Sequence, residues 1–269
     1  MMRSPGTEIN IHHRSTPMSD TQSIRLSMLI LGATLTTGCE VDASNNDLDT
    51  GVAGEREIHV AEAQSAARTT GGAPLPTSCQ DILDLDPTAA DGEYTLYVAG
   101  ARGRPWTARC DDMAGTPTEY LPLVHVGGRA NTSFYPCDGW SYGTDVTTSF
   151  THVRIDPATF EVDPSDLTYA TSSGACSSFT ALTALNWGFA GSCNGTPSGR
   201  ANVDLSGTPF VVAPDAFRID GWMAEGSAVY GAGSRVVRLV GGGACGYMLP
   251  TDAVEPGDAD ARVPLLYRP

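Results

Sequence analysis

Cysteine is the residue that most constrains this chain. The sequence of 269 residues has an odd number of cysteines, seven in all: Cys39, Cys79, Cys110, Cys137, Cys176, Cys193 and Cys245. Seven thiols cannot all pair within one chain, so at least one of them is free, shared with another chain or chemically modified. Cys39 differs from the others in its surroundings, because it follows an apolar run and precedes an acidic segment.

Cys39 follows the features of a bacterial export signal. Arg25 precedes an apolar run at residues 26–35, which is too short to cross about 30 Å of hydrocarbon. The small residues Thr36, Thr37 and Gly38 then lead directly to Cys39. This order resembles the lipobox of bacterial lipoproteins, which implies cleavage before Cys39 and lipidation of its side chain. An ordinary secretory signal followed by an unmodified thiol is the alternative.

The lipobox resemblance sets the expected location of the protein. Residues 1–38 are predicted to be a signal peptide, whose true start is Met18 if the apolar run lies at the usual distance from the N-terminus. A cysteine that carries several acyl chains stays in the membrane, whereas a single chain holds only marginally. We therefore expect a lipid-anchored protein of the bacterial cell envelope, at the outer membrane or the cell surface.

The six remaining cysteines predict three disulfides, because an exported chain folds in an oxidising compartment. Six cysteines allow fifteen pairings, and the sequence alone does not choose among them. Cys79 with Cys110 is the one predicted pair, because the two flank a hairpin-like stretch. In the chain-entropy model, a loop of that size contributes about 3 to 4 kcal/mol.

The charge balance excludes one class of partner. The sequence has 31 acidic and 16 basic residues, all of the latter arginine, and a formal net charge of −15. A nucleic-acid partner would need clustered cations to meet its phosphates. We therefore expect no nucleic-acid partner, and we interpret the acidic surface as a solvated one.

The chain divides by composition into a tether and a folded part. Residues 39–77 are polar, acidic and poor in aromatic residues, which predicts a disordered tether. Residues 78–269 suit one domain in length and predict a mainly β, loop-rich fold that disulfides stabilise and that contains one or two short helices. One of these helices is expected to follow Ser78. Strands are expected at residues 94–98, 119–124, 151–155, 201–205, 210–212, 235–240 and 263–267.

The sequence contains one candidate catalytic motif. Ser141, in the stretch from Gly139 to Gly143, matches the G-x-S-x-G nucleophile elbow, which needs a strand-to-helix turn and a later histidine. Residues 144–148 are poor helix formers, however, and His152 is the only histidine downstream. The zinc motif H-E-x-x-H does not occur in the sequence. We therefore predict no catalytic residue and no metal site, and a hydrolase that depends on Ser141 or is associated with a metallopeptidase remains the alternative.

Other clusters suggest ligands without specifying them. Calcium takes six to eight oxygen ligands, and no acidic group in the sequence has the spacing of a known calcium loop. No cofactor is predicted, with Ca²⁺ as the alternative at Asp81, Asp84 and Asp86, at Asp111 and Asp112, or at Asp252, Glu255, Asp258 and Asp260. The run Gly241-Gly242-Gly243 lacks the lysine of a phosphate loop and predicts a tight turn beside Cys245.

The order of the non-catalytic motifs resembles a known module. The motifs are Cys79, Asp91-Gly92-Glu93-Tyr94, Cys110 with Met113, Glu119-Tyr120-Leu121, Val153-Arg154-Ile155-Asp156, Ala190-Gly191-Ser192-Cys193, Asn202-Val203-Asp204-Leu205, Trp222 and Gly242-Gly243-Ala244-Cys245-Gly246. Over residues 79–250 they resemble the GON domain, a module of secreted metalloproteases with thrombospondin motifs (ADAMTS type). In those proteins the zinc chemistry belongs to a separate domain, so the resemblance implies no peptidase activity here.

The first part of this region also resembles a second family. Cys79 to Leu83, Asp91 to Tyr94 and Cys110 to Met113 are similar to the opening of fibrinogen-related domains, which are often calcium-supported lectins. The similarity ends after Met113 and leaves glycan binding open.

Together these observations favour a non-catalytic binding or adhesion module, presented on a lipid-anchored protein. Its ligand would be an extracellular protein or a glycan, and its membrane contact would be the lipid on Cys39. Exposed aromatic residues are the natural recognition surface, and the four tryptophans are the candidates, namely Trp106, Trp140, Trp187 and Trp222.

Overall fold

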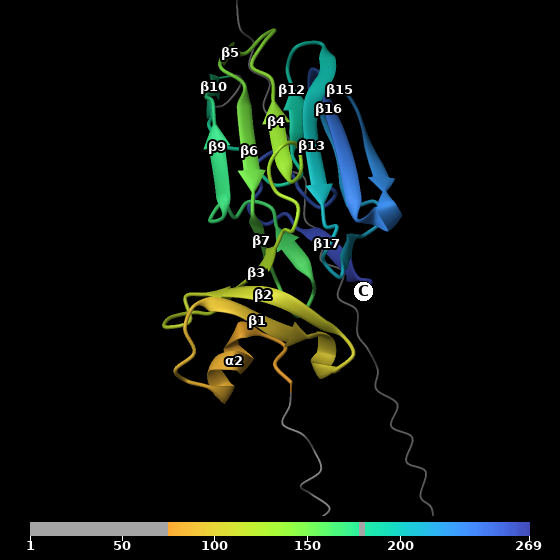
Figure 1. Ribbon diagram of the computed structural model, residues 1–269. Coiled ribbons are helices and arrows are strands. Elements are labelled where there is room, and N and C mark those ends of the chain that lie inside the picture. The colour runs from red at the N-terminus through yellow and green to blue at the C-terminus, as the bar shows by residue number, and fades with distance from the viewer. Residues whose placement is uncertain (1–74, 178–180) are drawn as a thin grey trace, which may run out of the picture. The chain divides into compact units, whose positions relative to one another are not determined.

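The computed structural model describes residues 75–177 and 181–269 (Figure 1). The predicted signal peptide and residues 39–74 of the predicted tether lie outside these ranges. About half of the described residues lie in β-strands, and three disulfides stabilise them, which confirms the predicted mainly β fold class. The helical elements described are α2 (Cys79–Leu85) and two 3-10 turns, η1 (Val98–Gly100) and η2 (Ala232–Ser234). Within the described ranges no helix combines the length and the apolar character that a membrane crossing requires.

Helix α2 begins where the sequence predicts, because Ser78 caps it. The Ser78 hydroxyl accepts the backbone N–H of Asp81 at 3.1 Å, and the Asp81 carboxylate accepts the N–H of Ser78 in return. This reciprocal pair is a capping box, which satisfies two backbone donors that the first turn leaves unpaired. Hydrogen bonds from Thr77 hold the pKa of Asp81 below its usual range. Asp81 is therefore engaged in capping.

The first sheet is antiparallel throughout and contains seven strands. In spatial order they are β1 (Gly92–Tyr97), β2 (Pro105–Asp111), β3 (Thr118–Pro122), β7 (His152–Ile155), β8 (Glu161–Asp163), β17 (Val263–Tyr267) and β14 (Phe210–Val212). Side chains in β2 alternate, so that Trp106, Ala108 and Cys110 are buried while their neighbours are not. This period of two is the pattern of a sheet with one face on the core.

The second sheet is built around one long strand. Its spatial order is β12 (Ala190–Ser192), β16 (Val236–Pro250), β13 (Thr196–Asp204), β4 (Thr132–Tyr135), β6 (Val146–Phe150) and β9 (Ala170–Ser173), with β15 (Phe217–Gly231) also paired to β16. A small third sheet contains β11 (Ala181–Leu182), β10 (Cys176–Ser177) and β5 (Tyr142–Gly143). In Figure 1 this small sheet lies at the end of the described part opposite to α2.

One hydrophobic core joins the two large sheets. It includes Leu96 and Val153 from the first sheet together with Val203 and Leu239 from the second, each at most 2% exposed. The predicted strands at 210–212 and 263–267 coincide with β14 and β17, whose inward side chains also belong to this core. Because both sheets bury residues in the same cluster, the described part folds as one unit.

Strand β16 folds back on itself at its glycines. A Cβ added to Gly241 would lie 2.6 Å from the backbone nitrogen of Met248, although residues seven apart in a straight strand are separated by about 23 Å. Gly242 and Gly243 have φ of 155° and 111° and remain paired with β15. The predicted turn at residues 241–243 is therefore a bend inside a strand. For the same reason the strand expected at 235–240 continues to Pro250.

A second close approach lies next to this bend. A Cβ on Gly199 of β13 would lie 2.3 to 2.5 Å from backbone atoms of Gly191 in β12. A Cβ on Gly241 would lie 2.2 Å from the carbonyl oxygen of Ala190. We call these three residues, Gly191, Gly199 and Gly241, the glycine crossing. Backbones can approach this closely only where side chains are absent.

The six cysteines of the described part form three disulfides. Cys79 pairs with Cys110, as predicted, and the two open pairings are Cys137 with Cys176 and Cys193 with Cys245. The first links α2 to β2, the second links the segment after β4 to β10, and the third links the end of β12 to β16. Cys39 lies outside the described residues.

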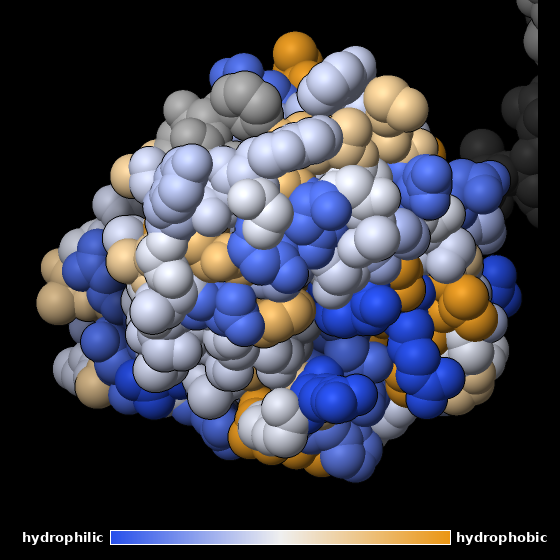
Figure 2. All heavy atoms as spheres, turned by 90° about the horizontal axis from the view of Figure 1, so that it is seen from above, coloured by the Kyte–Doolittle hydropathy of each residue, from blue (hydrophilic) through white to orange (hydrophobic). Residues whose placement is uncertain are grey.

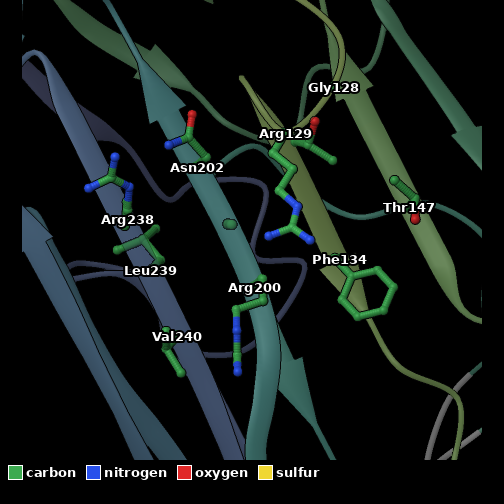
Figure 3. A pocket seen from close by; sticks show the side chains of 11 residues that line it. Gly128, Arg129, Phe134, Thr147, Arg200, Asn202, Arg238, Leu239 and Val240 are labelled. Carbon is green, nitrogen blue, oxygen red and sulfur yellow. The ribbon is translucent and has the colours of Figure 1, made fainter.

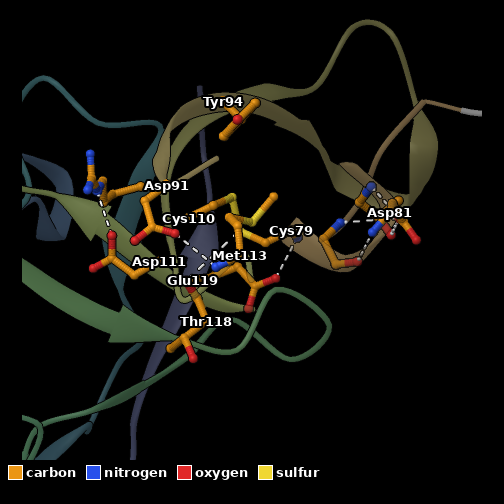
Figure 4. Close-up of a disulfide and its surroundings, with 12 residues drawn as sticks. Cys79, Asp81, Asp91, Tyr94, Cys110, Asp111, Met113, Thr118 and Glu119 are labelled. Carbon is orange, nitrogen blue, oxygen red and sulfur yellow. Dashed lines mark hydrogen bonds and ion pairs between the residues drawn. A yellow bond between two sulfur atoms is a disulfide. The ribbon is translucent and has the colours of Figure 1, made fainter. Parts of the chain in front are cut away.

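The Cys79–Cys110 disulfide packs beside a carboxylate (Figure 4). Cys79, Cys110 and Met113 form a small buried cluster, and Glu119 Oε1 accepts the backbone N–H of Cys79 at 2.6 Å. Burial raises the pKa of Glu119 above its usual range, because the low dielectric disfavours the ionised form. Glu119 therefore connects β3 to the start of α2 while partly withdrawn from water.

The glycine crossing predicts a steric effect at Gly199. Gly199→Ala places a methyl group against the backbone of Gly191, which cannot rotate away, so we expect a loss of about 2 kcal/mol or more in the free energy of unfolding. Gly103→Ala is the matched control, because a Cβ there meets nothing within 4 Å. Denaturant unfolding without reductant measures both. Equal stability of the two variants would contradict a tight crossing.

The environment of Glu119 predicts a pH dependence. A carboxyl whose pKa is raised by folding contributes stability below its ordinary pKa, and this contribution is lost as the pH rises through the raised value. Glu119→Gln keeps an acceptor for Cys79 but cannot ionise. We expect the free energy of unfolding of the wild type to fall relative to this variant as the pH rises from about 4 toward neutrality. Glu225→Gln, at an exposed position, is the control. A wild-type to Glu119→Gln difference that is constant with pH would contradict the assignment.

Candidate binding site

The structure separates the four candidate tryptophans into two classes. Trp106 and Trp187 are 3% and 1% exposed and belong to the core, where Trp187 Nε1 donates to Asn131 Oδ1 at 3.2 Å. Trp140 and Trp222 are 57% and 62% exposed. Their rings stack with centroids 6.1 Å apart and an interplanar angle of 26°. We call these two residues the tryptophan pair.

One disulfide positions both members of the tryptophan pair. The backbone N–H of Trp140 donates to the carbonyl oxygen of Cys193 at 3.2 Å. Trp222 stands directly opposite Cys245 in the register of β15 and β16. Because Cys193 and Cys245 are bonded to each other, the two tryptophans are anchored on either side of one covalent link.

The loop that carries Trp140 is held by polar side chains. Asn194 Nδ2 donates to Asp138 Oδ1 and to Ser198 Oγ, both at 2.7 Å. Gly139 has a φ of 65°, and a Cβ there would lie 2.6 Å from Cα of Asn194. The loop thus packs closely on the turn after β12. The sequence analysis did not identify Asp138 or Asn194 as part of a site. Both lie on the two segments that meet at Trp140.

Trp222 projects from a kink in β15. Gly221 before it has a φ of 108°, and a Cβ there would lie 2.4 Å from the carbonyl oxygen of Cys245. Met223 after it has a φ of 45°, which is unusual for a residue with a side chain, and is itself largely exposed. Strained backbone of this kind is maintained only where the surrounding structure enforces it.

The tryptophan pair is an exposed aromatic surface in a mostly polar exterior. Figure 2 shows one face of the molecule, on which hydrophobic residues form separate patches among hydrophilic ones. An indole ring offers a flat apolar face for contact and an N–H group for hydrogen bonding. Two such rings, stacked on each other and exposed, suit a ligand with flat, C–H-rich faces. They supply neither a nucleophile nor a general acid or base.

Ser141, the one nucleophile suggested by the sequence, does not lie in a catalytic arrangement. It is 6% exposed, and its hydroxyl hydrogen-bonds with that of Tyr135 at 3.2 Å. The chain continues from it into strand β5, whereas a nucleophile elbow continues into a helix. Neither described histidine hydrogen-bonds with Ser141. His152 lies on β7 in another sheet, where its ring packs on Tyr169 at 4.3 Å and burial lowers its pKa.

The acidic residues considered for calcium serve local structure. Asp111 accepts Arg109 Nε at 2.7 Å and the Tyr169 hydroxyl at 2.5 Å, and Asp252 accepts the backbone N–H of Arg262. Asp258 accepts the backbone N–H of Val254, which lowers its pKa. In residues 75–177 and 181–269, no three His, Cys, Asp or Glu side chains gather in an arrangement that would hold a metal ion.

Comparison with known protein families finds a match, which covers the part of the chain that holds the tryptophan pair. Residues 128–255 match the GON domain family, over a shorter span than the resemblance at 79–250 suggested. No curated protein and no solved structure matches the chain. The matched span contains both tryptophans of the pair and the two disulfides Cys137–Cys176 and Cys193–Cys245. A GON domain is a module and not itself a catalytic domain. The chain thus contains a region, residues 128–255, that matches the GON domain.

Proposed function

We propose that this protein is an exported, lipid-anchored protein of the bacterial cell envelope whose GON domain is a non-catalytic module that binds glycans. The single observation that carries the binding role is the tryptophan pair. Two large aromatic side chains are more than half exposed, and they are fixed beside each other by the Cys193–Cys245 disulfide. Aromatic surface left in water has an energetic cost, which a bound ligand would remove.

The geometry of the pair favours a sugar over a protein segment. Pyranose rings present flat C–H faces that pack on aromatic rings, and their hydroxyls hydrogen-bond with nearby polar groups. Asp138 lies two residues before Trp140, so its carboxylate flanks the aromatic surface, while the Asn194 amide that it accepts from is fully used within the loop. A pre-positioned site loses little side-chain entropy on binding. These features together support a saccharide ligand.

The location rests on the sequence around Cys39. Residues 36–39 resemble a lipobox, and six further cysteines form three disulfides, as expected in an oxidising compartment. The acidic segment at 39–77 would then separate the binding module from the bilayer. We place the module at the outer membrane or the cell surface, where it would meet extracellular ligands.

A glycan array tests the binding role. We expect the purified protein to bind a subset of glycans, and Trp140→Ala with Trp222→Ala to reduce that binding by about tenfold or more, because truncating a tryptophan at the centre of a binding site typically costs about 2 kcal/mol or more. Trp140→Phe and Trp222→Phe should retain part of it. Both tryptophans are exposed, so the variants should keep the wild-type fold, which thermal unfolding checks.

Val254→Ala is the matched control for the array, because Val254 is a hydrophobic residue 82% exposed on a loop away from the pair in sequence. Absence of glycan binding by a correctly folded protein would contradict the proposal. Capture of an extracellular matrix protein in place of a glycan, dependent on the same tryptophans, would keep the module a binding one but refute the saccharide ligand.

Fractionation of bacterial cells tests the anchor. We expect the wild-type protein in the membrane fraction with a lipid-modified Cys39, and Cys39→Ser in the soluble exported fraction, because the acyl chains supply the membrane affinity. Intact-mass measurement before and after reduction reports the lipid and the three disulfides together. Cys39→Ser that remains with the membrane to the same extent would refute the lipid anchor.

A further inference from the structure

The outer face of the second sheet carries a groove that the tryptophan pair does not use (Figure 3). Its volume is about 640 Å³, within the usual range for small-molecule sites. Strand register defines its floor. Thr147, Phe134, Arg200 and Val240 stand opposite one another across β6, β4, β13 and β16. Thr132, Asn202 and Arg238 form the next row across β4, β13 and β16.

Three arginines line this groove. Arg200 and Arg238 lie on the neighbouring strands β13 and β16 in diagonal positions, which places them about 7 to 8 Å apart at the backbone. Arg129 comes from the turn before β4, and in Figure 3 its guanidinium extends over the sheet between Asn202 and Arg200. We call these three residues the arginine cluster.

The arginine cluster brings three arginines without acidic partners to one groove. Other described arginines, namely Arg102, Arg104, Arg235 and Arg268, also form no ion pair, but they do not gather in this way. Arg109, Arg154, Arg218 and Arg262 each lie within ion-pair distance of an aspartate. In residues 75–177 and 181–269, the three arginines of the cluster form no ion pair. The chain has a net charge of −15, so acids are abundant elsewhere. Three like charges gathered without a counter-charge repel each other, and a bound anion would relieve that repulsion.

The local contacts leave the cluster available to a ligand. Arg200 donates its Nη1 to the carbonyl oxygens of Pro197 and Gly199, at 2.6 and 2.8 Å, which fixes one side of its guanidinium. Asp204, the next outward acid along β13, accepts the backbone N–H of Ser206 and lies 3.7 Å from His125 Nδ1. The carboxylate nearest along the strand is therefore already engaged outside the groove.

The side chains of the groove define the chemistry of its ligand. Guanidinium groups bind carboxylates and sulfates through paired, charge-assisted hydrogen bonds. The hydroxyls of Thr132 and Thr147 and the amide of Asn202 suit ligand hydroxyls, and the ring of Phe134 offers a flat apolar face. An oxyanion, hydroxyls and a ring face occur together in acidic sugars.

We propose that the arginine cluster binds the carboxylate or sulfate of an acidic sugar, as a second site distinct from the tryptophan pair. The choice of a saccharide rests on the proposed glycan-binding function, whereas the anion site rests on the groove alone. The protein would then hold an acidic polysaccharide at one surface and a sugar face at another. Every residue of the cluster lies within the span that matches the GON domain.

Isothermal titration of the mature protein tests this site with three probes: a galacturonate oligosaccharide for carboxylate, a sulfated dextran oligosaccharide for sulfate, and a neutral dextran of the same length. We expect at least one acidic probe to bind, with an affinity that falls as the salt concentration rises. Substitutions in the arginine cluster should not change the titration result for neutral dextran. Arg200→Ala with Arg238→Ala should reduce the affinity for the acidic probe by about tenfold or more. Arg200→Lys with Arg238→Lys should retain only part of the affinity, because lysine keeps the charge without the paired geometry.

Arg102→Ala with Arg268→Ala is the matched control, since both arginines are exposed and the pair removes the same charge elsewhere. Equal loss in the two double variants would mean a general charge effect and would overturn the proposal. Unchanged affinity in the Arg200 and Arg238 variant would also overturn it. Acidic binding that survives Trp140→Ala with Trp222→Ala supports two sites, even if neutral glycans do not bind. If the tryptophan double variant loses the acidic probe while the arginine double variant still binds it, the second site is refuted and the proposed glycan-binding function is kept.

Discussion

The glycine crossing is the constraint on which the rest of the second sheet depends. Three strands approach so closely at Gly191, Gly199 and Gly241 that a Cβ added to Gly199 or Gly241 would collide with backbone atoms, and one added to Gly191 would press on the side chains of Phe189 and Tyr247. This absence of side chains lets β16 double back, so that its first half pairs with β13 and its second half with β12. Sheets normally keep strands about 4.8 Å apart in one layer, and only glycine permits the tighter contact found here.

Both candidate sites follow from the course of β16. Its first half places Arg238 diagonally across from Arg200, which forms one side of the groove. Beyond the bend, Cys245 bonds to Cys193 and stands opposite Trp222, while the carbonyl of Cys193 holds Trp140. A protein that binds through such surfaces needs rigid support more than mobile groups, because the cost of ordering a site is then met during folding. The bend and its disulfide supply that support within a few residues.

The sequence predicted local structure well and long-range structure poorly, for identifiable reasons. Ser78 predicts the start of α2 because capping is local, and residues 210–212 and 263–267 predict strands because their apolar runs are buried. Strand β15 escaped notice because most of it is exposed and its pattern lacks alternation. Trp140 and Trp222 could not be told from Trp106 and Trp187, since burial depends on which strands pair. The arginine cluster was invisible for the same reason, because register brings Arg129, Arg200 and Arg238 together.

The three disulfides differ more in what they position than in what they stabilise. They join residues separated by 31, 39 and 52 positions. Loop entropy grows only with the logarithm of loop length, so the longest and shortest loops differ by about 0.5 kcal/mol in the chain-entropy model. Local roles therefore distinguish them. Cys79–Cys110 ties α2 to the first sheet. Cys193–Cys245 links the turn after β12, which hydrogen-bonds with Trp140, to the part of β16 that pairs with Trp222. Because the glycine crossing already brings those segments together, the disulfide acts on a geometry that packing has set. It thereby limits how far Trp140 and Trp222 can separate. This matters because the proposed binding depends on the relative positions of the two rings and on no reactive group.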